Sequence, residues 1–233
     1  MSALRQWASL CIALLPTFGA TAGEAVLAPG YGPLQYTPPP AGSYALPSLG
    51  QAADGRVLNA AGEQLALHNM FGDKLVLLGF IYTRCSDING CPLASYVMKK
   101  VQDGVARDDD LRTQVRLISL SFDPLSDTPK TLRDYARHFR RQGFDWQFLT
   151  TASESDLQPI LEGYGQWRQK NYDENGDYTG SMSHILRVYL VDRQGRIRNI
   201  YSTGFLDADT VINDLRTLKI ENDAQQSTNL GAG

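Results

Sequence analysis

The stretch LVLLGFIYTRCSDINGCPLASYVM, residues 75–98, decides the fold of this chain. Its first eight residues, 75–82, are apolar, branched and aromatic, which is typical of a strand buried on both faces. Pro92 suits the first turn of a helix, because a proline lacks the N–H that this turn leaves unpaired. Cys85 and Cys91 therefore lie in a loop between the carboxyl end of a strand and the start of a helix.

This placement predicts reactive thiols. The positive end of the helix dipole and its free amides favour a thiolate over a thiol, and Cys91, beside Pro92, is expected to feel this most. Two neighbouring thiolates can close reversibly into a disulfide or bind a soft metal ion. The alternative is a structural staple. A disulfide across so short a loop would stabilise the fold by only about 2 kcal/mol, roughly half of the gain from a 100-residue loop.

Residues 1–22 have the features of a secretory signal peptide. Arg5 supplies the positive charge, an apolar stretch follows, and the small residues ATA at 20–22 end it. This stretch is shorter than the roughly 20 residues of a membrane-spanning helix, so cleavage is expected rather than a retained anchor. Cys11 would be removed with it. The mature protein is therefore expected in the periplasm without a membrane span, where its two remaining cysteines must cycle or be kept reduced by a thiol reductant.

The 233 residues suffice for one domain with its own core. The formal net charge of −3 offers no surface for nucleic acid. Residues 23–47 are rich in Gly and Pro and are interpreted as an extended linker that lies on the domain or joins it to something else. Residues 48–220 are expected to form the domain, and the polar residues 221–233 to form a flexible tail.

Further strands and helices alternate after the cysteine loop. Residues 115–122 and 146–149 are expected to be strands, and Pro129 to begin a helix between them that Asp127 or Thr128 can cap. The pair Asn175-Gly176 predicts a tight hairpin turn; the spacing of glycine and glutamate required for a calcium-binding loop is absent there. This order predicts a thioredoxin-like α/β three-layer sandwich, with a mixed sheet, flanking helices and an extra hairpin.

His184 is the expected third ligand beside the cysteines. It stands just before an expected strand, where its side chain can lean over the end of the sheet. Cys85, Cys91 and His184 form a soft donor set that suits a copper ion, because Cu(I) accepts three ligands whereas zinc would require a fourth. Met182 and His68 are weaker candidates, the first as a thioether ligand and the second as a lone exposed histidine.

The combination resembles the Sco/SenC family, whose members assemble the copper centre of cytochrome c oxidase. The matching segments are FIYTRC at 80–85, Cys91-Pro92, SFDP at 121–124, DTP at 127–129, WQFL at 146–149, and His184 before YLVD at 189–192. The resemblance implies a thioredoxin-like domain whose two cysteines and histidine bind copper. The copper would be delivered to the oxidase subunit or to another copper protein, or used together with thiol–disulfide exchange.

One feature departs from the family pattern, in which three residues usually separate the cysteines. This chain has five, SDING at 86–90. Gly90 could let the loop fold back so that the sulfurs stay within bridging distance. The longer loop could equally change copper affinity or favour redox work. Asp123 and Asp127 belong to the family motif and are interpreted as turn and cap residues; the alternative for Asp123 is to orient a ligand or dock a partner.

These residues are compatible with four functions. The leading hypothesis is a copper-binding assembly factor, a metallochaperone rather than an enzyme. The alternative is a periplasmic thiol–disulfide oxidoreductase that keeps client cysteines reduced, with Cys85 and Cys91 as its catalytic redox pair. A peroxidase fits poorly, because Thr83 is one residue too close to the first cysteine. An interaction module with a structural disulfide is the fourth.

Overall fold

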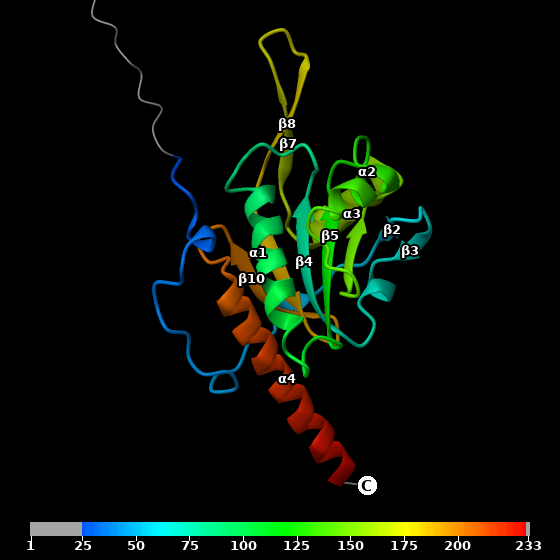
Figure 1. Ribbon diagram of the computed structural model, residues 1–233. Helices are drawn as coiled ribbons and strands as arrows, with labels where there is room; N and C mark the ends of the chain where they lie inside the picture. Colours follow the sequence, from blue (N-terminus) through cyan, green and yellow to red (C-terminus); the bar gives the residue numbers. More distant parts are fainter. Residues whose placement is uncertain (1–24, 232–233) are drawn as a thin grey trace, which may run out of the picture.

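A six-stranded mixed sheet forms the centre of residues 25–231, which the computed structural model describes (Figure 1). The expected signal peptide, with Cys11, lies outside these residues. In chain order the strands are β1 (Gly50–Gln51), β4 (Leu75–Ile81), β5 (Val115–Ser121), β6 (Trp146–Leu149), β9 (Arg187–Val191) and β10 (Arg196–Ser202). They lie side by side in the order β1-β10-β9-β4-β5-β6.

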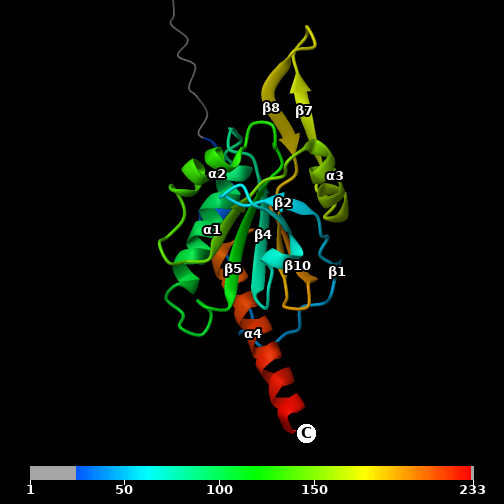
Figure 2. The same ribbon diagram turned by 90° about the vertical axis from the view of Figure 1, so that its right-hand side faces the viewer.

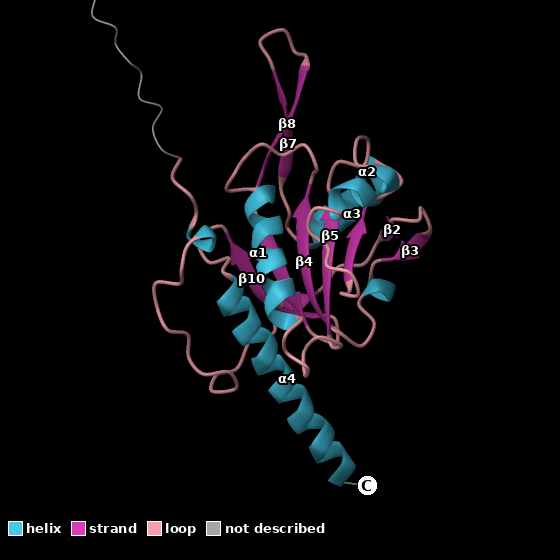
Figure 3. Ribbon diagram, in the orientation of Figure 1, coloured by secondary structure: helices cyan, strands magenta, loops and turns pink. Residues whose placement is uncertain are grey.

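Two hairpins and several helices surround this sheet (Figure 3). The hairpins are β2 (Arg56–Leu58) with β3 (Gln64–Ala66), and β7 (Arg168–Tyr172) with β8 (Tyr178–His184). The α-helices are α1 (Cys91–Val105), α2 (Pro129–Ala136), α3 (Glu154–Gly163) and α4 (Ala208–Gly231), and the short 3-10 helices are η1 (Pro29–Tyr31) and η2 (His68–Met70). The hairpin β7–β8 contains the tight turn that the Asn-Gly pair predicted.

The apolar run that opens the cysteine stretch forms β4, and all seven of its residues are buried. β4 pairs in parallel with β5, with Leu75 opposite Val115, and antiparallel with β9, with Leu77 opposite Leu190. β6 extends the parallel set beyond β5. Because the carboxyl ends of parallel strands meet at one edge of a sheet, the loops that follow β4 and β5 converge there.

The helices cover both faces of the sheet. α1 begins at Cys91 with Pro92 in its first turn, as the sequence predicted. Its buried side chains include Leu93, Val97 and Val101, and it packs against β4 and α4. α1 and α4 lie on one face and α3 on the other (Figure 2). The expected three-layer arrangement is therefore present.

α4 is longer than the sequence predicted. The polar composition of residues 221–233 indicates a flexible tail, but the helix continues to Gly231. The guanidinium of Arg198, on β10, donates to both carboxylate oxygens of Glu221 at 3.1 and 2.8 Å. This buried arginine fixes the helix where the tail was expected to begin. The prediction of a flexible tail is therefore wrong for residues 221–231.

Residues 25–47, expected to be a linker, lie on the domain beside α1 and α4 (blue in Figure 1). The hydroxyl of Tyr44 donates to Asp214 at 2.5 Å, and the side-chain amide of Asn213 donates to the carbonyl of Pro39 at 2.8 Å. The segment is thus held by α4 along part of its length. Among the described residues, no helix combines the length and apolar composition that a membrane crossing requires.

Candidate metal and redox site

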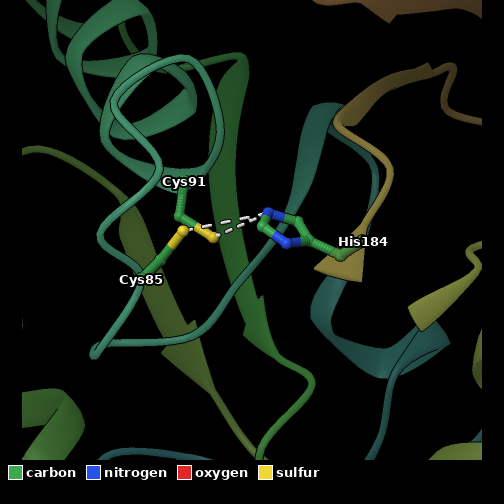
Figure 4. A group of neighbouring side chains, drawn as sticks. All are labelled: Cys85, Cys91 and His184. Atoms are coloured by element: carbon green, nitrogen blue, oxygen red, sulfur yellow. Dashed lines mark hydrogen bonds between the residues drawn. The ribbon is translucent and has the colours of Figure 1, made fainter. Parts of the chain in front are cut away.

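Cys85, Cys91 and His184 lie together at the edge of the sheet where β4 and β5 end (Figure 4). The two sulfurs and one imidazole nitrogen lie within 4.8 Å of one another. The Nε2 atom of His184 is 3.5 Å from the Cys91 sulfur and 3.9 Å from the Cys85 sulfur. The fold therefore brings a residue from late in the chain to the cysteine pair, as the sequence predicted.

His184 reaches the cysteines from the hairpin rather than from the central sheet. It is the last residue of β8, and two residues separate it from β9. Its Nδ1 lies 3.2 Å from the carbonyl oxygen of Met182. A proton on Nδ1 would be donated to this carbonyl, which leaves the lone pair of Nε2 free to face the sulfurs. The backbone of its own strand thus orients the imidazole so that Nε2 faces the sulfurs.

Two aromatic rings enclose the imidazole. Tyr82 meets it edge-on, with 5.6 Å between ring centroids, and Phe122 lies at 5.2 Å. The hydroxyl of Tyr82 also accepts a hydrogen bond from the amide of Met182 at 3.3 Å. These two residues follow directly after β4 and β5, and the sequence predicted them as strand residues and as members of the family motifs, without a role beside the histidine. Their position directly after β4 and β5 was the available signal for a role at the site.

The cysteine loop folds back through a turn at Asp87. The amide of Gly90 donates to the Asp87 carbonyl at 2.9 Å, and the amide of Asn89 donates to the Asp87 carboxylate at 3.1 Å. A β-carbon at position 90 would stand 3.1 Å from Nε2 of His184. A side chain at this position would crowd the imidazole, which would have to shift by a few tenths of an ångström to make room.

The two thiols differ in protonation, and not in the predicted direction. A hydrogen bond from Cys91 lowers the pKa of Cys85 to about 4 against the opposing effect of burial, and His184 contributes in the same sense. Burial raises the pKa of Cys91 well above its usual range, and the nearby Cys85 adds to this. The prediction that Cys91 is the stronger thiolate is therefore wrong. Its sulfur is buried at the helix start, so the helix dipole is outweighed by the loss of solvation.

The charge on Cys85 also acts on His184. Burial works against a protonated imidazole, but the hydrogen bonds to Cys85 and to the Met182 carbonyl outweigh it and raise the pKa of His184. The reduced site therefore holds a thiolate beside an imidazole that binds its proton more tightly than usual. Such a pair is suited to nucleophilic attack by sulfur and to binding a soft cation.

Asp127 holds the residues just before the cysteine loop through its buried carboxylate. Its buried carboxylate accepts hydrogen bonds from the amide and hydroxyl of Thr83 at 3.0 and 2.5 Å, and from the hydroxyl of Ser121 at 2.6 Å. The N-cap of α2 is Thr128, whose side chain accepts from the amide of Thr131. Of the two residues predicted as possible caps, Thr128 is confirmed and Asp127 is wrong; Asp127 instead fixes the residues that lead into the cysteine loop.

Asp123 ties the same loop to the segment after β5. Its carboxylate pairs with Arg84 at 3.0 Å, and Arg84 also donates to the Ser126 hydroxyl at 2.7 Å. Its own backbone carbonyl accepts from the amide of Asp127 at 2.8 Å, so the turn interpretation holds as well. Asp123 therefore combines a turn with an ion pair to the residue that precedes Cys85.

The weaker candidates do not join the site. His68 lies in η2, where its Nε2 is 2.8 Å from the carbonyl oxygen of Ala52. Met182 is buried, and its sulfur contacts the guanidinium of Arg168 at 3.6 Å. Neither belongs to the ligand group formed by the two cysteines and His184 within the described residues.

Comparison with known proteins identifies the family. A model of the SCO1/SenC family matches residues 53–219, which is most of the described domain. The chain belongs to the SCO1/SenC family. Among its Sco relatives, the SCO1 protein homolog of Bacillus subtilis (strain 168) is 27% identical over 161 residues, 68% of this chain and 78% of that protein. The chain spans about half the length of several other curated relatives that it matches, 55% in one case.

Solved Sco structures share the fold. The structure of Bradyrhizobium japonicum ScoI with copper bound superposes with a TM-score of 0.59 at 24% identity, and the match covers 72% of this chain and 99% of that one. BsSco, described as a member of the Sco family of cytochrome c oxidase assembly proteins and as having a disulfide switch, gives 0.57 at 25% identity over 75% of this chain and 96% of that one. The predicted thioredoxin-like α/β fold is confirmed.

Proposed function

We propose that this Sco protein binds one copper ion through Cys85, Cys91 and His184 and supplies it to the copper site of a client, such as a cytochrome c oxidase subunit. One observation carries the proposal: Nε2 of His184 faces both sulfurs, at 3.5 and 3.9 Å. Metal–ligand bonds of about 2.0–2.3 Å would separate the donors of a three-coordinate ion by roughly 3.5–4 Å. The ligand atoms need little movement to close on an ion.

The chemistry of the donors also supports copper as cargo. Two sulfurs and an imidazole are soft ligands that suit Cu(I), and they match Cu(II) as well. Cys85 offers a thiolate, while Cys91 must release its proton when the ion binds. Cys91 is only 2% exposed, whereas Cys85 and His184 are partly open to solvent. The two open ligands can exchange with those of a client while the buried one holds the ion.

The comparisons support the same proposal. A related ScoI was solved with copper bound, and BsSco is described as belonging to a family of oxidase assembly proteins. Export through residues 1–22 would bring the protein to the periplasm, where it would meet its client. The expected partners are the client copper protein and a thiol reductant for the cysteine pair.

Copper titration of the reduced protein tests the proposal. We expect one equivalent of Cu(II) to give thiolate-to-copper absorption bands that disappear in His184→Ala. His68→Ala is the matched control, because His68 is also a partly exposed imidazole that contacts a backbone carbonyl, but it lies in η2. That control should keep the bands. Full copper loading of His184→Ala would contradict the proposed ligand set.

The opposite pKa shifts of the two cysteines favour a second function. The thiolate of Cys85 could attack a client disulfide, so that one client sulfur leaves as a thiolate and a mixed disulfide forms. Cys91 would then lose its proton and attack Cys85, which releases the second client thiolate and leaves a Cys85–Cys91 disulfide. An external thiol reductant would restore both cysteines. Retained insulin reduction in His184→Ala, without copper binding in the wild type, would favour this thiol oxidoreductase over the carrier.

A further inference from the structure

The cysteine loop is bound from outside by a segment near the amino terminus, residues 26–31, which we call the strap. The side-chain oxygen of Asn89 accepts a hydrogen bond from the amide of Ala28 at 2.7 Å. The side-chain nitrogen of the same residue donates to the carbonyl of Val26 at 3.0 Å. One half-buried amide therefore pairs with two backbone groups of the strap, as a neighbouring strand would.

Further contacts hold the strap in this position. The hydroxyl of Tyr31 donates to the carbonyl of Ile88 at 2.7 Å, and its ring stacks on Tyr96 of α1 with centroids 5.1 Å apart. Gly30 is buried beneath, and a β-carbon there would stand 2.2 Å from the carbonyl oxygen of Leu206. The strap is thus fixed at both the cysteine loop and the helix layer.

The residues that hold the strap are also residues of the metal-site loop. Ile88 and Asn89 lie between the two cysteines, and Asn89 is followed by Gly90, whose α-carbon borders the His184 imidazole. Asn89 also donates its own amide to Asp87, the residue whose carbonyl lies 3.9 Å from the Cys85 sulfur. A displacement of Asn89 would therefore change the turn that sets the position of Cys85.

We propose that Asn89 is a positioning residue that clamps the strap onto the cysteine loop and so holds the Cys85 sulfur at its ligating distance from His184. The inference rests on the proposed copper site and assigns a part in it to the five-residue loop and to residues 26–31. With the strap bound, the loop keeps both sulfurs turned to the imidazole. With the strap released, the loop is free to move Cys85 and the ion is lost faster.

Asn89→Ala tests this in the full chain. Loss of two hydrogen bonds is expected to speed the transfer of Cu(I) to an excess chelator by about tenfold. The thiolate-to-copper band of the Cu(II) form should also shift, which a loss of global stability alone would not cause. Asn59→Ala is the matched control, because Asn59 also binds the backbone of its own loop, at Ala61 and Glu63, away from the site. That control should change neither readout.

A second variant displaces the strap without changing a residue of the loop. Gly30→Val places side-chain atoms against the carbonyl of Leu206, and against Leu93 and Val97 of α1, and should reproduce the faster copper transfer and the shifted band of Asn89→Ala. Hydrogen exchange of the amides at 26–31 reports whether the strap has left. A released strap with unchanged copper transfer and spectrum would overturn the inference.

The two proposals fail in distinguishable ways. If the wild type takes up no copper, the proposed function is wrong, and iodoacetamide labelling of Cys85 still tests the clamp. In that case Asn89→Ala and Gly30→Val should each change the labelling rate of Cys85 by about fivefold, and Asn59→Ala should not. Equal labelling rates in all four proteins would overturn the role of Asn89 independently of copper.

Discussion

The pKa values of Cys85 and Cys91 shift in opposite directions, because burial and hydrogen bonding differ between their sulfurs. A helix N-terminus typically stabilises a nearby negative charge by about 0.3–1 kcal/mol, which is small beside the cost of burying that charge. Cys91 starts α1 and gains this stabilisation, but its sulfur has little contact with water. It therefore keeps its proton and donates a hydrogen bond to the sulfur of Cys85, which is the thiolate of the pair.

The first prediction concerns the order of alkylation in the reduced, metal-free protein. The pKa of Cys85 is about 4, so iodoacetamide at pH 6 should label it well before the buried Cys91. Cys91→Ala is expected to slow labelling of Cys85 at this pH, because it removes the hydrogen bond that contributes most to lowering the pKa of Cys85. Peptide mass spectrometry measures both rates. Faster labelling of Cys91 than of Cys85 would contradict the assignment.

The second prediction concerns the support beneath the loop. Asp127→Ala leaves the Thr83 amide and two hydroxyl groups without their buried acceptor. Because each unpaired buried group costs about 1–3 kcal/mol, the free energy of unfolding should fall by about 3 kcal/mol. Urea denaturation measures this change. Thr128→Ala, which removes only the α2 cap, should cost about 1 kcal/mol. An equal loss in the two variants would show that the three hydrogen bonds to Asp127 contribute no more than one helix cap.

At the scale of elements, the hairpin β7–β8 is what brings His184 to the cysteines. Arg168 lies opposite His184 at the base of the hairpin, so the register of the two strands sets where the imidazole stands. The hairpin projects from the sheet beside the cysteine loop (Figures 1 and 2). Its side chains rather than a large core hold it, since only Met182 of β8 is buried.

The third prediction follows from the cross-strand contacts of Asn171. Its side chain donates to the Ser181 hydroxyl at 3.1 Å and accepts from the Ser183 hydroxyl at 2.9 Å. Asn171→Ala should therefore let the hairpin open more often, with amide exchange in β8 about fivefold faster. Exchange in the buried strand β4 is the internal control and should not change. Equal protection of β8 in both proteins would show that these contacts do not hold the hairpin.

Some elements were predicted from the sequence more closely than others. β4 and α1 carry strong local signals, an apolar run and a cysteine-proline start, and both were predicted closely. The role of Asp127 and the packing of Tyr82 and Phe122 around His184 were not. These depend on which loops meet at the sheet edge, and the residue types alone are equally typical of turns and cores.

At the scale of the whole molecule, three parallel strands are tied together at the edge opposite the candidate site. Asp145, just before β6, accepts hydrogen bonds from Lys74 at 2.8 Å and from Arg116 at 2.9 Å. Burial alone would raise the pKa of Asp145, but the hydrogen bonds from these two residues lower it to about 2. The carboxylate therefore contributes more stability when charged than when protonated.

The fourth prediction is the pH dependence that this carboxylate causes. Because the folded-state pKa is lowered, its contribution is complete above the unfolded pKa of about 4 and is lost as the pH falls toward 2. After allowance for solvent screening the contribution is about 1 kcal/mol. The difference in unfolding free energy between wild type and Asp145→Asn, from urea titrations, should shrink across this range. A constant difference from pH 5 to pH 2 would contradict it.

The parts of the molecule that the sequence did not predict are held by distant contacts. Asn89 binds Val26 and Ala28, and Arg198 binds Glu221, and neither partner can be recognised from residue type or local pattern. The sequence therefore left open whether the proline- and glycine-rich stretch lies on the domain, and it predicted a flexible tail for a polar stretch that is helical. The central fold and the three candidate ligands depended on local runs and on a family pattern, which the sequence does display.

The long final helix has a practical consequence. α4 extends beyond the domain on the side away from the hairpin, so its last turns and the cysteine loop lie at opposite ends of the molecule (Figure 1). A fluorophore or a surface-attachment tag placed there would leave the ligand face open to a docking protein. Single-molecule experiments could thus attach their label to the end of α4 and follow the transfer of the metal ion without disturbing it.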